Sequence, residues 1–578
     1  MDFSWHLDCP NALAGQNVLA VSGVGYAAYL WVGLLLLKAG SLQMNVQSLQ
    51  SERDRVLALF DASSPASQYL NLQISKISDA FLHGDAVTSA VSSSVVRQRV
   101  RDTQMPEIAM FAPEYVDYIQ SEIVAHSVNV ACPRFIGHMT SALPAVVQDM
   151  SRLMTALNQN TVKLETAKSL TYLERQVLAT MHRLVFGFSS DFYDQHVQNA
   201  DSTLGMITSG GTVANIAALW CARNKALPPT SQFPGVEACG LPSALRDYGF
   251  SDAVVVGSSL MHYSLDKAVG VLGLGTESLI KIETDDRHHI NLNALEAALS
   301  ACKRRKQLII AVVGIAGTTD SGAIDPLPEV AQIAHSYGAH FHVDAAWGGA
   351  ALFSREYARR LEGIEQADSV TLDGHKQLYL PMGLGMLLLR DPQIALHIQK
   401  QARYIVRPGS YDLGRRSLEG SRPGMVLLLH AMLNLIGRRG YEVLIDEGIR
   451  KTHYLVRSIQ ARPEFELLIH PDMNIVTYRY LPSEYRSRDA LEHLSDEDQQ
   501  LISKTNQSLQ RVQRRAGRTF VSRTTIDRGY HGRTVSVVAL RAVLANPLTT
   551  EADIDAVLDD QVELGKAFEV DERTASVA

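Results

Sequence analysis

Short apolar runs that resemble β-strands alternate with helical stretches through the middle of the chain, from Leu204 to Gly437. Such alternation is typical of βα units, in which helices connect the strands of a mostly parallel sheet. The pattern therefore predicts an α/β fold for this part of the chain. The strand-like runs are Leu204–Ile207, Ala253–Gly257, Leu308–Gly314, Ala339–Val343, Ser369–Leu372 and Met386–Leu389.

Two of these runs are followed by residues that can take part in chemistry. Asp344 stands at the C-terminal edge of the run in FHVDAAWGG, and Lys376 follows the run in SVTLDGHKQLYLPMGLG. In open α/β sheets, ligands bind at the carboxyl ends of the strands. A lysine that can form a Schiff base and an acid that can pair with a ring nitrogen are what pyridoxal phosphate (PLP) requires of a protein.

A third segment, MITSGGTVANIAALW, can bind the phosphate of such a cofactor. Small residues, Ser209, Gly210, Gly211 and Thr212, open an apolar-periodic helix there, and the free N–H groups and dipole of a helix N-terminus favour a dianion. Taken singly, each segment has an ordinary structural interpretation. The two glycines indicate a turn, Asp344 a helix cap, and His375 with Lys376 a pair of surface residues. Together, in the order of phosphate cup, acid and lysine, they predict a PLP site.

These segments resemble the group II PLP-dependent amino-acid decarboxylases of fold type I, a family that includes glutamate, aromatic amino-acid and aspartate 1-decarboxylases. The resemblance runs from about Pro133 to about Asp553. It implies the PLP-dependent transferase fold of type I, with a mostly parallel seven-stranded sheet in the large domain. The expected parts are a helical dimerisation segment at 44–190, a PLP-binding large domain at 191–438 and a small C-terminal α/β domain at 439–578. The resemblance also implies a homodimer.

The resemblance assigns further residues to the cofactor. His262, in SSLMHYSLDKA, takes the place of the histidine that stacks on the PLP ring, although a satisfied core histidine is the alternative. Thr318 lies in a turn near the ring, Ala346 packs beneath the ring, and His375 precedes the lysine. In the loop after Lys376, a tyrosine of the family protonates the product carbon. Tyr404 is the first candidate for that role and Tyr411 is the second.

Candidates for binding the substrate come from two segments. CPRFIGHMTSALP resembles the substrate edge of the family and offers Arg134, His138, Thr140 and Ser141, with a structural crossing loop as the alternative. Arg422, in LEGSRP, can pair with a substrate carboxylate or form a structural ion pair, and the following Pro423 departs from the family pattern.

These polar groups suit a small-molecule amino acid with an acidic side chain. The chain most resembles the bacterial aspartate 1-decarboxylases, which make β-alanine for pantothenate and coenzyme A. Decarboxylation of glutamate to γ-aminobutyrate is the alternative, because one methylene group separates the two substrates by only about 1–3 kcal/mol. A PLP-fold lyase or transaminase and a membrane-anchored binding protein are alternatives from other classes.

The composition of the chain argues against several classes of protein and indicates its compartment. The chain has 578 residues and a net charge of −7 without long charged runs, which argues against a nucleic-acid partner. Its five cysteines are scattered without CxxC spacing, which predicts neither a disulfide framework nor a metal site. A reducing compartment follows from this cysteine usage, and we expect the protein in the cytoplasm.

The N-terminal extension, residues 1–43, is unusually apolar. Its stretch Val18–Leu37 is long enough to span a bilayer, and Lys38 would then place the rest of the chain in the cytoplasm. We expect this extension to be sequence upstream of a true start at Met44, with a membrane anchor or a buried helix as alternatives.

Overall fold

The computed structural model of the chain describes residues 46–401, 409–487, 489, 491, 493–530 and 533–577. The chain divides into two compact units, one of Met1–Lys76 and Pro106–Asp117 and one of Ile77–Met105 and Tyr118–Ala578. The apolar stretch Val18–Leu37 and the loop residue Tyr404 lie outside the described residues. Within the described part of the chain, no helix combines the length and the apolar character needed to cross a membrane.

The first unit is helical. It contains α2 (Val46–Ala58), the start of α3 (Pro65–Leu82) and most of α5 (Ala112–Tyr118). Large apolar side chains of this unit remain exposed to solvent, namely Leu57, Leu59, Phe60, Ile108 and Phe111.

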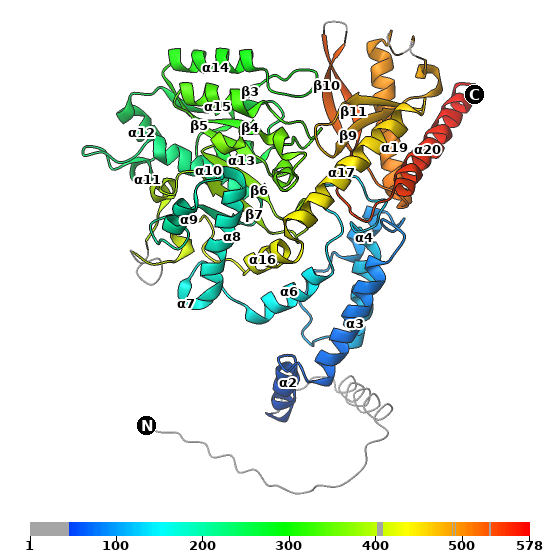
Figure 1. Cartoon of the computed structure of the whole chain (residues 1–578). Coiled ribbons are helices and arrows are strands. Elements are labelled where there is room, and N and C mark those ends of the chain that lie inside the picture. Colours follow the sequence, from blue (N-terminus) through cyan, green and yellow to red (C-terminus); the bar gives the residue numbers. More distant parts are fainter. Residues whose placement is uncertain are drawn as a thin grey trace. The chain divides into compact units, whose positions relative to one another are not determined.

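A seven-stranded sheet forms the centre of the second unit (Figure 1). Its strands are β1 (Gly205–Thr208), β2 (Asp252–Ser258), β3 (Leu279–Ile282), β4 (Gln307–Ile315), β5 (His340–Asp344), β6 (Ser369–Asp373) and β7 (Gly385–Leu389). They are ordered β1-β7-β6-β5-β4-β2-β3, and β7 is antiparallel to both of its neighbours while the other pairs are parallel. The expected mostly parallel seven-stranded sheet is confirmed.

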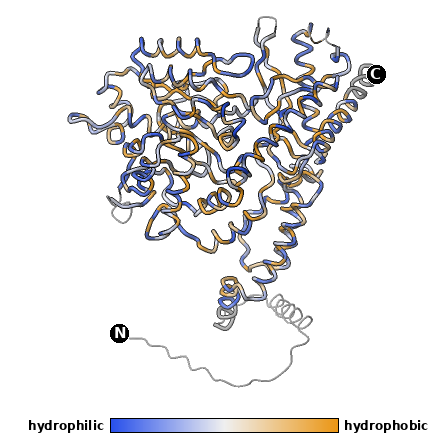
Figure 2. Tube along the Cα trace, viewed as in Figure 1, coloured by the Kyte–Doolittle hydropathy of each residue, from blue (hydrophilic) through white to orange (hydrophobic). Residues whose placement is uncertain are grey.

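Helices cover both faces of this sheet. Alternate residues of β2 and β4 pack in two different cores, one with α8 (Ser169–Phe186), α14 (Leu292–Arg304) and α15 (Leu327–Ser336), the other with α10 (Gly211–Ala226) and α13 (Ser264–Val271). Hydrophobic and hydrophilic stretches alternate along these helices (Figure 2), as expected when one side of each helix faces a sheet. The carboxyl ends of β2, β4, β5 and β6 therefore meet at one open edge.

A second, antiparallel sheet lies in the C-terminal part of the same unit. Its strands are β8 (Phe465–Ile469), β9 (Ile475–Tyr480), β10 (Ser522–Tyr530) and β11 (Arg533–Val543), in the order β10-β11-β9-β8. The helices α17 (Gly437–Gln460), α19 (Asp496–Ala516) and α20 (Glu551–Val577) pack on it through a shared apolar core. Because α17 also packs against the segment that follows β5, the domain boundary expected after residue 438 stays a prediction.

The other α-helices of the described residues are α4 (Ser93–Arg99), α6 (Val146–Leu157), α7 (Leu164–Ala167), α9 (Ser190–His196), α11 (Val236–Cys239), α12 (Leu241–Tyr248) and α16 (Val426–Leu435). Of these, α16 packs its buried apolar residues into the core of the seven-stranded sheet.

Candidate active site

Lys376 lies just beyond the carboxyl end of β6, next to an acid. Its Nζ is 3.2 Å from Oδ2 of Asp373, the buried last residue of β6. The neighbouring His375 donates from Nδ1 to the carbonyl oxygen of Leu384 at 2.9 Å, which leaves Nε2 3.6 Å from the same Asp373 oxygen. The sequence predicted Lys376 and His375 but not Asp373, which holds the lysine in place.

The predicted phosphate cup closes on this pair from the start of α10. Gly210 has φ of 153°, which favours glycine, and a Cβ there would lie 3.5 Å from Cε1 of His375. A Cβ on Gly211 would come within 2.9 Å of Asp373 Oδ2, so the helix start approaches the acid through its glycines. The first N–H groups of a helix have no acceptor within the helix. The cup therefore presents free donors beside His375 and Lys376.

An anion already binds to this turn. The N–H of Ser209 donates to Oε1 of Glu419 at 3.0 Å, so a carboxylate of the chain takes the position of an anionic ligand. Thr212 follows in the first turn of α10. The N–H of Ser209 thus contacts a carboxylate, while the phosphate-binding role expected of Ser209 to Thr212 stays a prediction.

Asp344, the last residue of β5, is buried and supported from behind by Asn215 of α10. Nδ2 of Asn215 donates to Asp344 Oδ2 at 2.9 Å, and the N–H of Ala346 donates to Asp344 Oδ1 at 3.2 Å. Ala346 thereby lies beside the acid, as its expected place beneath a ring requires. Asn215 was not predicted; its one sequence signal is an amide within the apolar run ANIAAL.

His262 lies within electrostatic reach of Asp344 and Lys376. Burial lowers the pKa of its imidazole, while the negative charge of Asp344 raises it and the positive charge of Lys376 lowers it. A flat imidazole can stack on an aromatic ring, and this role of His262 toward the cofactor stays a prediction.

These residues fit PLP. Its phosphate needs an anion site, its aldehyde an amine, and its pyridine nitrogen an acid. The cup at Ser209–Thr212, Lys376 and Asp344 offer these three groups at one edge of the sheet. The fold and the site together define a PLP-dependent enzyme of fold type I.

Comparison with known proteins agrees with this class. Residues 97–481 match the family described as the pyridoxal-dependent decarboxylase conserved domain. The chain is 42% identical to aspartate 1-decarboxylase of Aliivibrio fischeri over 520 residues, 89% of this chain and 94% of that protein. It is 29% identical to acidic amino acid decarboxylase GADL1 of Xenopus tropicalis, over 77% of this chain and 81% of that one.

Among solved structures, mouse CSAD in its apo form matches with a TM-score of 0.75 and 26% identity, covering 86% of this chain and 99% of that chain. The chain belongs to the pyridoxal-dependent decarboxylase family. It is a PLP-dependent amino-acid decarboxylase, and PLP is its cofactor.

The sequence analysis did not single out Arg541, a buried arginine of the second sheet. Arg541 of β11 donates from Nε to the carbonyl oxygen of Thr319 at 2.7 Å and from Nη1 to that of Gly137 at 3.4 Å. Its Nη2 is buried without a hydrogen-bond partner in the described part of the chain. Burial lowers the pKa of Arg541 to about 10, so the guanidinium is charged at neutral pH.

His138 lies within electrostatic reach of this arginine and of the lysine. Its pKa is lowered by burial first and then by the positive charges of Arg541, Lys376 and His375. Its Nδ1 lies 3.1 Å from Oγ1 of Thr140, so these two predicted side chains contact each other, and their roles toward a substrate stay predictions.

Two of three other predicted residues, Thr318 and Arg134, have partners within the chain. The hydroxyl of Thr318 accepts from the N–H of Ala323 at 3.1 Å and thereby shapes its own turn. Ser141 is buried next to Thr140. Arg134 is 46% exposed in its side chain and pairs with Asp553 at 3.3 Å. The expected roles of these three residues toward cofactor and substrate stay predictions, and the ion pair of Arg134 favours a structural role.

Arg422 also has an acidic partner. Its Nη1 and Nη2 donate to the two oxygens of Glu174 in α8, at 2.8 and 2.6 Å, and both side chains are buried. This bidentate pair occupies both terminal nitrogens. The geometry favours the structural ion pair over the carboxylate-binding role that the sequence also allowed.

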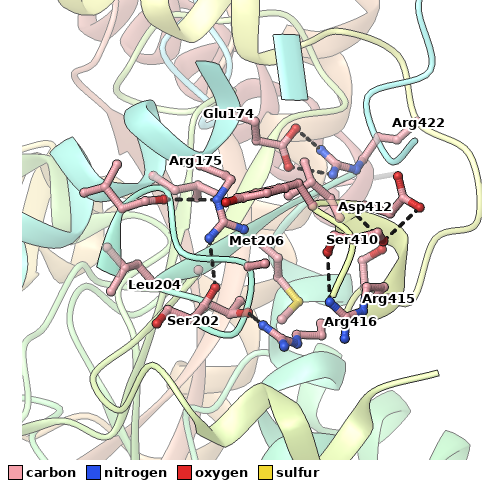
Figure 3. Close-up of a pocket in the computed structure, with 18 residues that line it drawn as sticks. Glu174, Arg175, Ser202, Leu204, Met206, Ser410, Asp412, Arg415, Arg416 and Arg422 are labelled. Atoms are coloured by element: carbon pink, nitrogen blue, oxygen red, sulfur yellow. Dashed lines mark hydrogen bonds and ion pairs between the residues drawn. The ribbon is translucent and has the colours of Figure 1, made fainter. Parts of the chain in front are cut away.

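The pair lines a narrow cavity between α8 and the segment Ser410–Ser417 (Figure 3). The cavity has a volume of about 30 Å³, which is room for about one water molecule rather than an amino acid. Tyr411, the second tyrosine candidate, lies in this wall with its ring 5.5 Å from that of Tyr172. Lys376, Asp344 and His262 do not line it.

Proposed function

We propose that this decarboxylase removes the α-carboxylate of an acidic L-amino acid, and that L-aspartate is the substrate, with β-alanine and carbon dioxide as products. The names of two relatives, an aspartate 1-decarboxylase and an acidic amino acid decarboxylase, support this substrate class. Glutamate is the alternative acid. A relative of Rhizobium meliloti that is 30% identical over 74% of this chain is an L-2,4-diaminobutyrate decarboxylase, so a basic side chain has to be tested as well.

The observation that carries the acidic substrate is the buried guanidinium of Arg541. A buried charge is stable only when it is paired; the negative charge of Asp320 acts on Arg541, yet Nη2 of Arg541 has no hydrogen-bond partner among the described residues. A substrate carboxylate supplies both the charge and the acceptor. The positive charges of Arg541 and Lys376 both lower the pKa of His138, which supports a carboxylate site at Arg541 near the amine that holds the cofactor.

The residues of the site divide the work. PLP, when bound, accepts the electron pair that remains when the carboxylate leaves. Lys376 supplies the amine that holds PLP, Asp344 pairs with the protonated ring nitrogen, and His262 covers the ring. Arg541 fixes one carboxylate of the substrate, which sets the orientation of the other carboxylate relative to the ring. The loop with Tyr404 lies outside the described residues, so its role in protonating the product stays a prediction.

The test is a competition among amino acids. The purified full chain, loaded with PLP, is offered equal concentrations of L-aspartate, L-glutamate and L-2,4-diaminobutyrate, and the amine products and carbon dioxide are quantified. β-Alanine as the main product supports the proposal. γ-Aminobutyrate would move the specificity to glutamate, 1,3-diaminopropane would overturn the acidic class, and turnover without carbon dioxide would point to a lyase or transaminase.

A variant at Arg541 connects the specificity to the structure. Arg541→Lys keeps the charge but loses the planar fork, so we expect kcat/KM for the acidic substrate to fall roughly 10–100-fold while PLP binding stays unchanged. Arg523→Lys, on the exposed neighbouring strand β10, is the matched control and should behave like the wild type. Equal kcat/KM in both variants would exclude Arg541 from substrate binding.

We also infer that the protein is a cytoplasmic homodimer. The exposed apolar side chains of the first unit, including Phe60 and Ile108, support a partner surface. The scattered cysteines support a reducing compartment. Fractionation of cells that express the full chain tests the location, and recovery of the chain with membranes would contradict it.

A further inference from the structure

A row of buried polar side chains leads from Asp344 into the interior of the second unit. Asn215 Nδ2 is 2.9 Å from Asp344 Oδ2, and Asn215 Oδ1 is 3.1 Å from His342 Nε2. His342 Nδ1 is 2.8 Å from the hydroxyl of Ser369, which is 2.7 Å from His340 Nε2. All five side chains are buried. We call this row the Asp344 relay.

The two strands bring the members of the relay together. His340, His342 and Asp344 alternate along β5 and therefore project to the same face of the sheet. Ser369 opens the neighbouring strand β6, where it pairs with His342 in the parallel register. Asn215 comes from the second turn of α10, whose first turn forms the phosphate cup. The same helix thus contacts both ends of the cofactor site.

Hydrogen-bond chemistry gives the relay a direction. The carboxylate of Asp344 only accepts, so Asn215 donates to it from Nδ2 and accepts through Oδ1. His342 then carries its proton on Nε2 and accepts at Nδ1 from the hydroxyl of Ser369. The oxygen of Ser369 accepts in turn from Nε2 of His340. Every donor in the row therefore points toward Asp344.

Both histidines of the relay are neutral, as this assignment requires. Burial lowers the pKa of His342 to about 4, against the smaller opposing effects of Asp344 and of a hydrogen bond with the backbone of Ser369. Burial lowers the pKa of His340 to about 3, against the smaller opposing effect of Asp368. A neutral imidazole donates from one nitrogen only. The relay consequently adds no positive charge that would compete with the ring nitrogen for Asp344.

The alternative is a purely structural role, in which the hydrogen bonds of these buried residues only hold α10 against β5 and β6. Apolar side chains of similar size would join them at least as well, because buried polar groups add little net stability. His340 Nδ1 is moreover left without a partner among the described residues, which is a cost that an apolar core avoids. All hydrogen bonds of the row point toward Asp344, so a role in holding the Asp344 carboxylate explains the row better than a purely structural role does.

We propose that Asn215 and His342 are positioning residues, which hold Asp344 as an oriented carboxylate against the pyridine nitrogen of PLP. The donors of the relay stabilise the negative charge, and the fixed amide of Asn215 sets the rotation of the carboxylate. The relay thereby strengthens PLP binding and keeps the ring nitrogen protonated. This inference rests on the PLP site alone and holds whichever amino acid is the substrate.

A matched pair of variants at His342 tests the relay. Glutamine places its amide nitrogen near the position of Nε2 and can still donate to Asn215, whereas leucine cannot. We expect His342→Leu to weaken PLP binding to the apoenzyme roughly tenfold, the lower end of what outer-shell partners contribute at metal sites. His342→Gln should stay within about threefold of the wild type. The readout is the absorbance of bound PLP during titration, without any substrate.

The pH dependence of the bound-cofactor absorbance is the second readout. His342→Leu should shift this profile toward lower pH, because a less stabilised Asp344 holds the ring proton less strongly. Ser369→Ala keeps both histidines and removes only one link, so it provides a milder variant with a smaller shift in the same direction if His342→Leu does not fold.

His182→Leu is the control for the loss of a buried histidine. His182 is also buried and neutral, but it bonds Tyr193 and the carbonyl of Leu389, away from Asp344. It should lower thermal stability without changing PLP affinity. If His342→Leu, His342→Gln and Ser369→Ala all had the PLP affinity and pH profile of the wild type, the relay would have only a structural role and the proposal would be overturned. A failure to decarboxylate aspartate would leave these binding results unaffected.

Discussion

At the scale of single residues, the buried pair of Arg422 and Glu174 makes a prediction about stability. Removing one partner leaves the other charge buried and unpaired, which costs about 3–5 kcal/mol. Arg422→Met should therefore lower the thermal midpoint strongly. The double variant Glu174→Leu/Arg422→Met should recover most of that loss, because an apolar pair of similar volume avoids the desolvation cost.

The same variants separate the two roles that the sequence allowed for Arg422. With a structural role, the double variant retains kcat/KM and PLP affinity close to those of the wild type. A stable double variant with a strongly raised KM would instead return Arg422 to the substrate site. Thermal unfolding and steady-state kinetics on the same preparations decide between these outcomes.

Residue types and local motifs could predict the part of the site that lies within short segments. The cup, Asp344, His262 and Lys376 each stand in a continuous stretch whose composition matches one chemical need. Arg541 could not be found this way, because its partner Gly137 is 404 positions away in the sequence. By residue type alone, Arg134 and Arg422 are equivalent candidates; the fold gives each of them an acidic partner, whereas the hydrogen bonds of Arg541 go to neutral groups and its Nη2 has no partner among the described residues.

At the scale of elements, His289 and Asp472 join the loop before α14 to the loop between β8 and β9. His289 Nε2 donates to Asp472 Oδ2 at 2.7 Å, and this hydrogen bond raises the pKa of His289 against the opposing effect of burial. Asp285 also raises it, and Arg287 lowers it. The folded pKa thus lies above the unfolded value of about 6.5. The contact adds stability below about pH 6.5 that is lost as the pH rises through the folded pKa.

His289→Asn tests this contact between loops. The variant should be less stable than the wild type by about 1 kcal/mol at pH 6, and the difference should shrink by pH 9. Thermal midpoints across this range measure the effect. In an Asp472→Asn background the pH dependence of the difference should become smaller, with Asp285 accounting for what remains; a difference that is constant with pH in the wild-type background would show that the proton plays no part.

Element prediction succeeded where apolar runs were continuous. β4 was predicted within a residue at each end, because its buried residues form an unbroken apolar run. β5 was also predicted within a residue at each end, although two histidines interrupt its apolar residues. β3 and β10 were missed. β3 is short and carries Lys281 among its four residues, and β10, SRTTIDRGY, lies at the edge of its sheet with mostly polar side chains. Pairing with a neighbouring strand makes β10 a strand, and a local pattern does not show that neighbour.

At the scale of the whole molecule, we expect the interface between the two copies of the homodimer to lie on the first unit. Phe60 is 84% exposed and Ile108 is 79% exposed, and large apolar side chains that cluster on a surface mark interfaces. Light scattering coupled to size exclusion should give twice the chain mass of 63.5 kDa for the wild type. A Phe60→Asp/Ile108→Asp variant should shift toward the single-chain mass, because a two-fold contact places each new charge in the interface twice.

Val271→Asp is the matched control for this variant. Val271 is 68% exposed at the end of α13, so it adds the same charge at an apolar position outside the first unit. The control should keep the double mass. Equal masses for Phe60→Asp/Ile108→Asp and the wild type would place the contact elsewhere on the chain. A wild type at 63.5 kDa would refute the homodimer itself, while the PLP site, which is described within one chain, would stand.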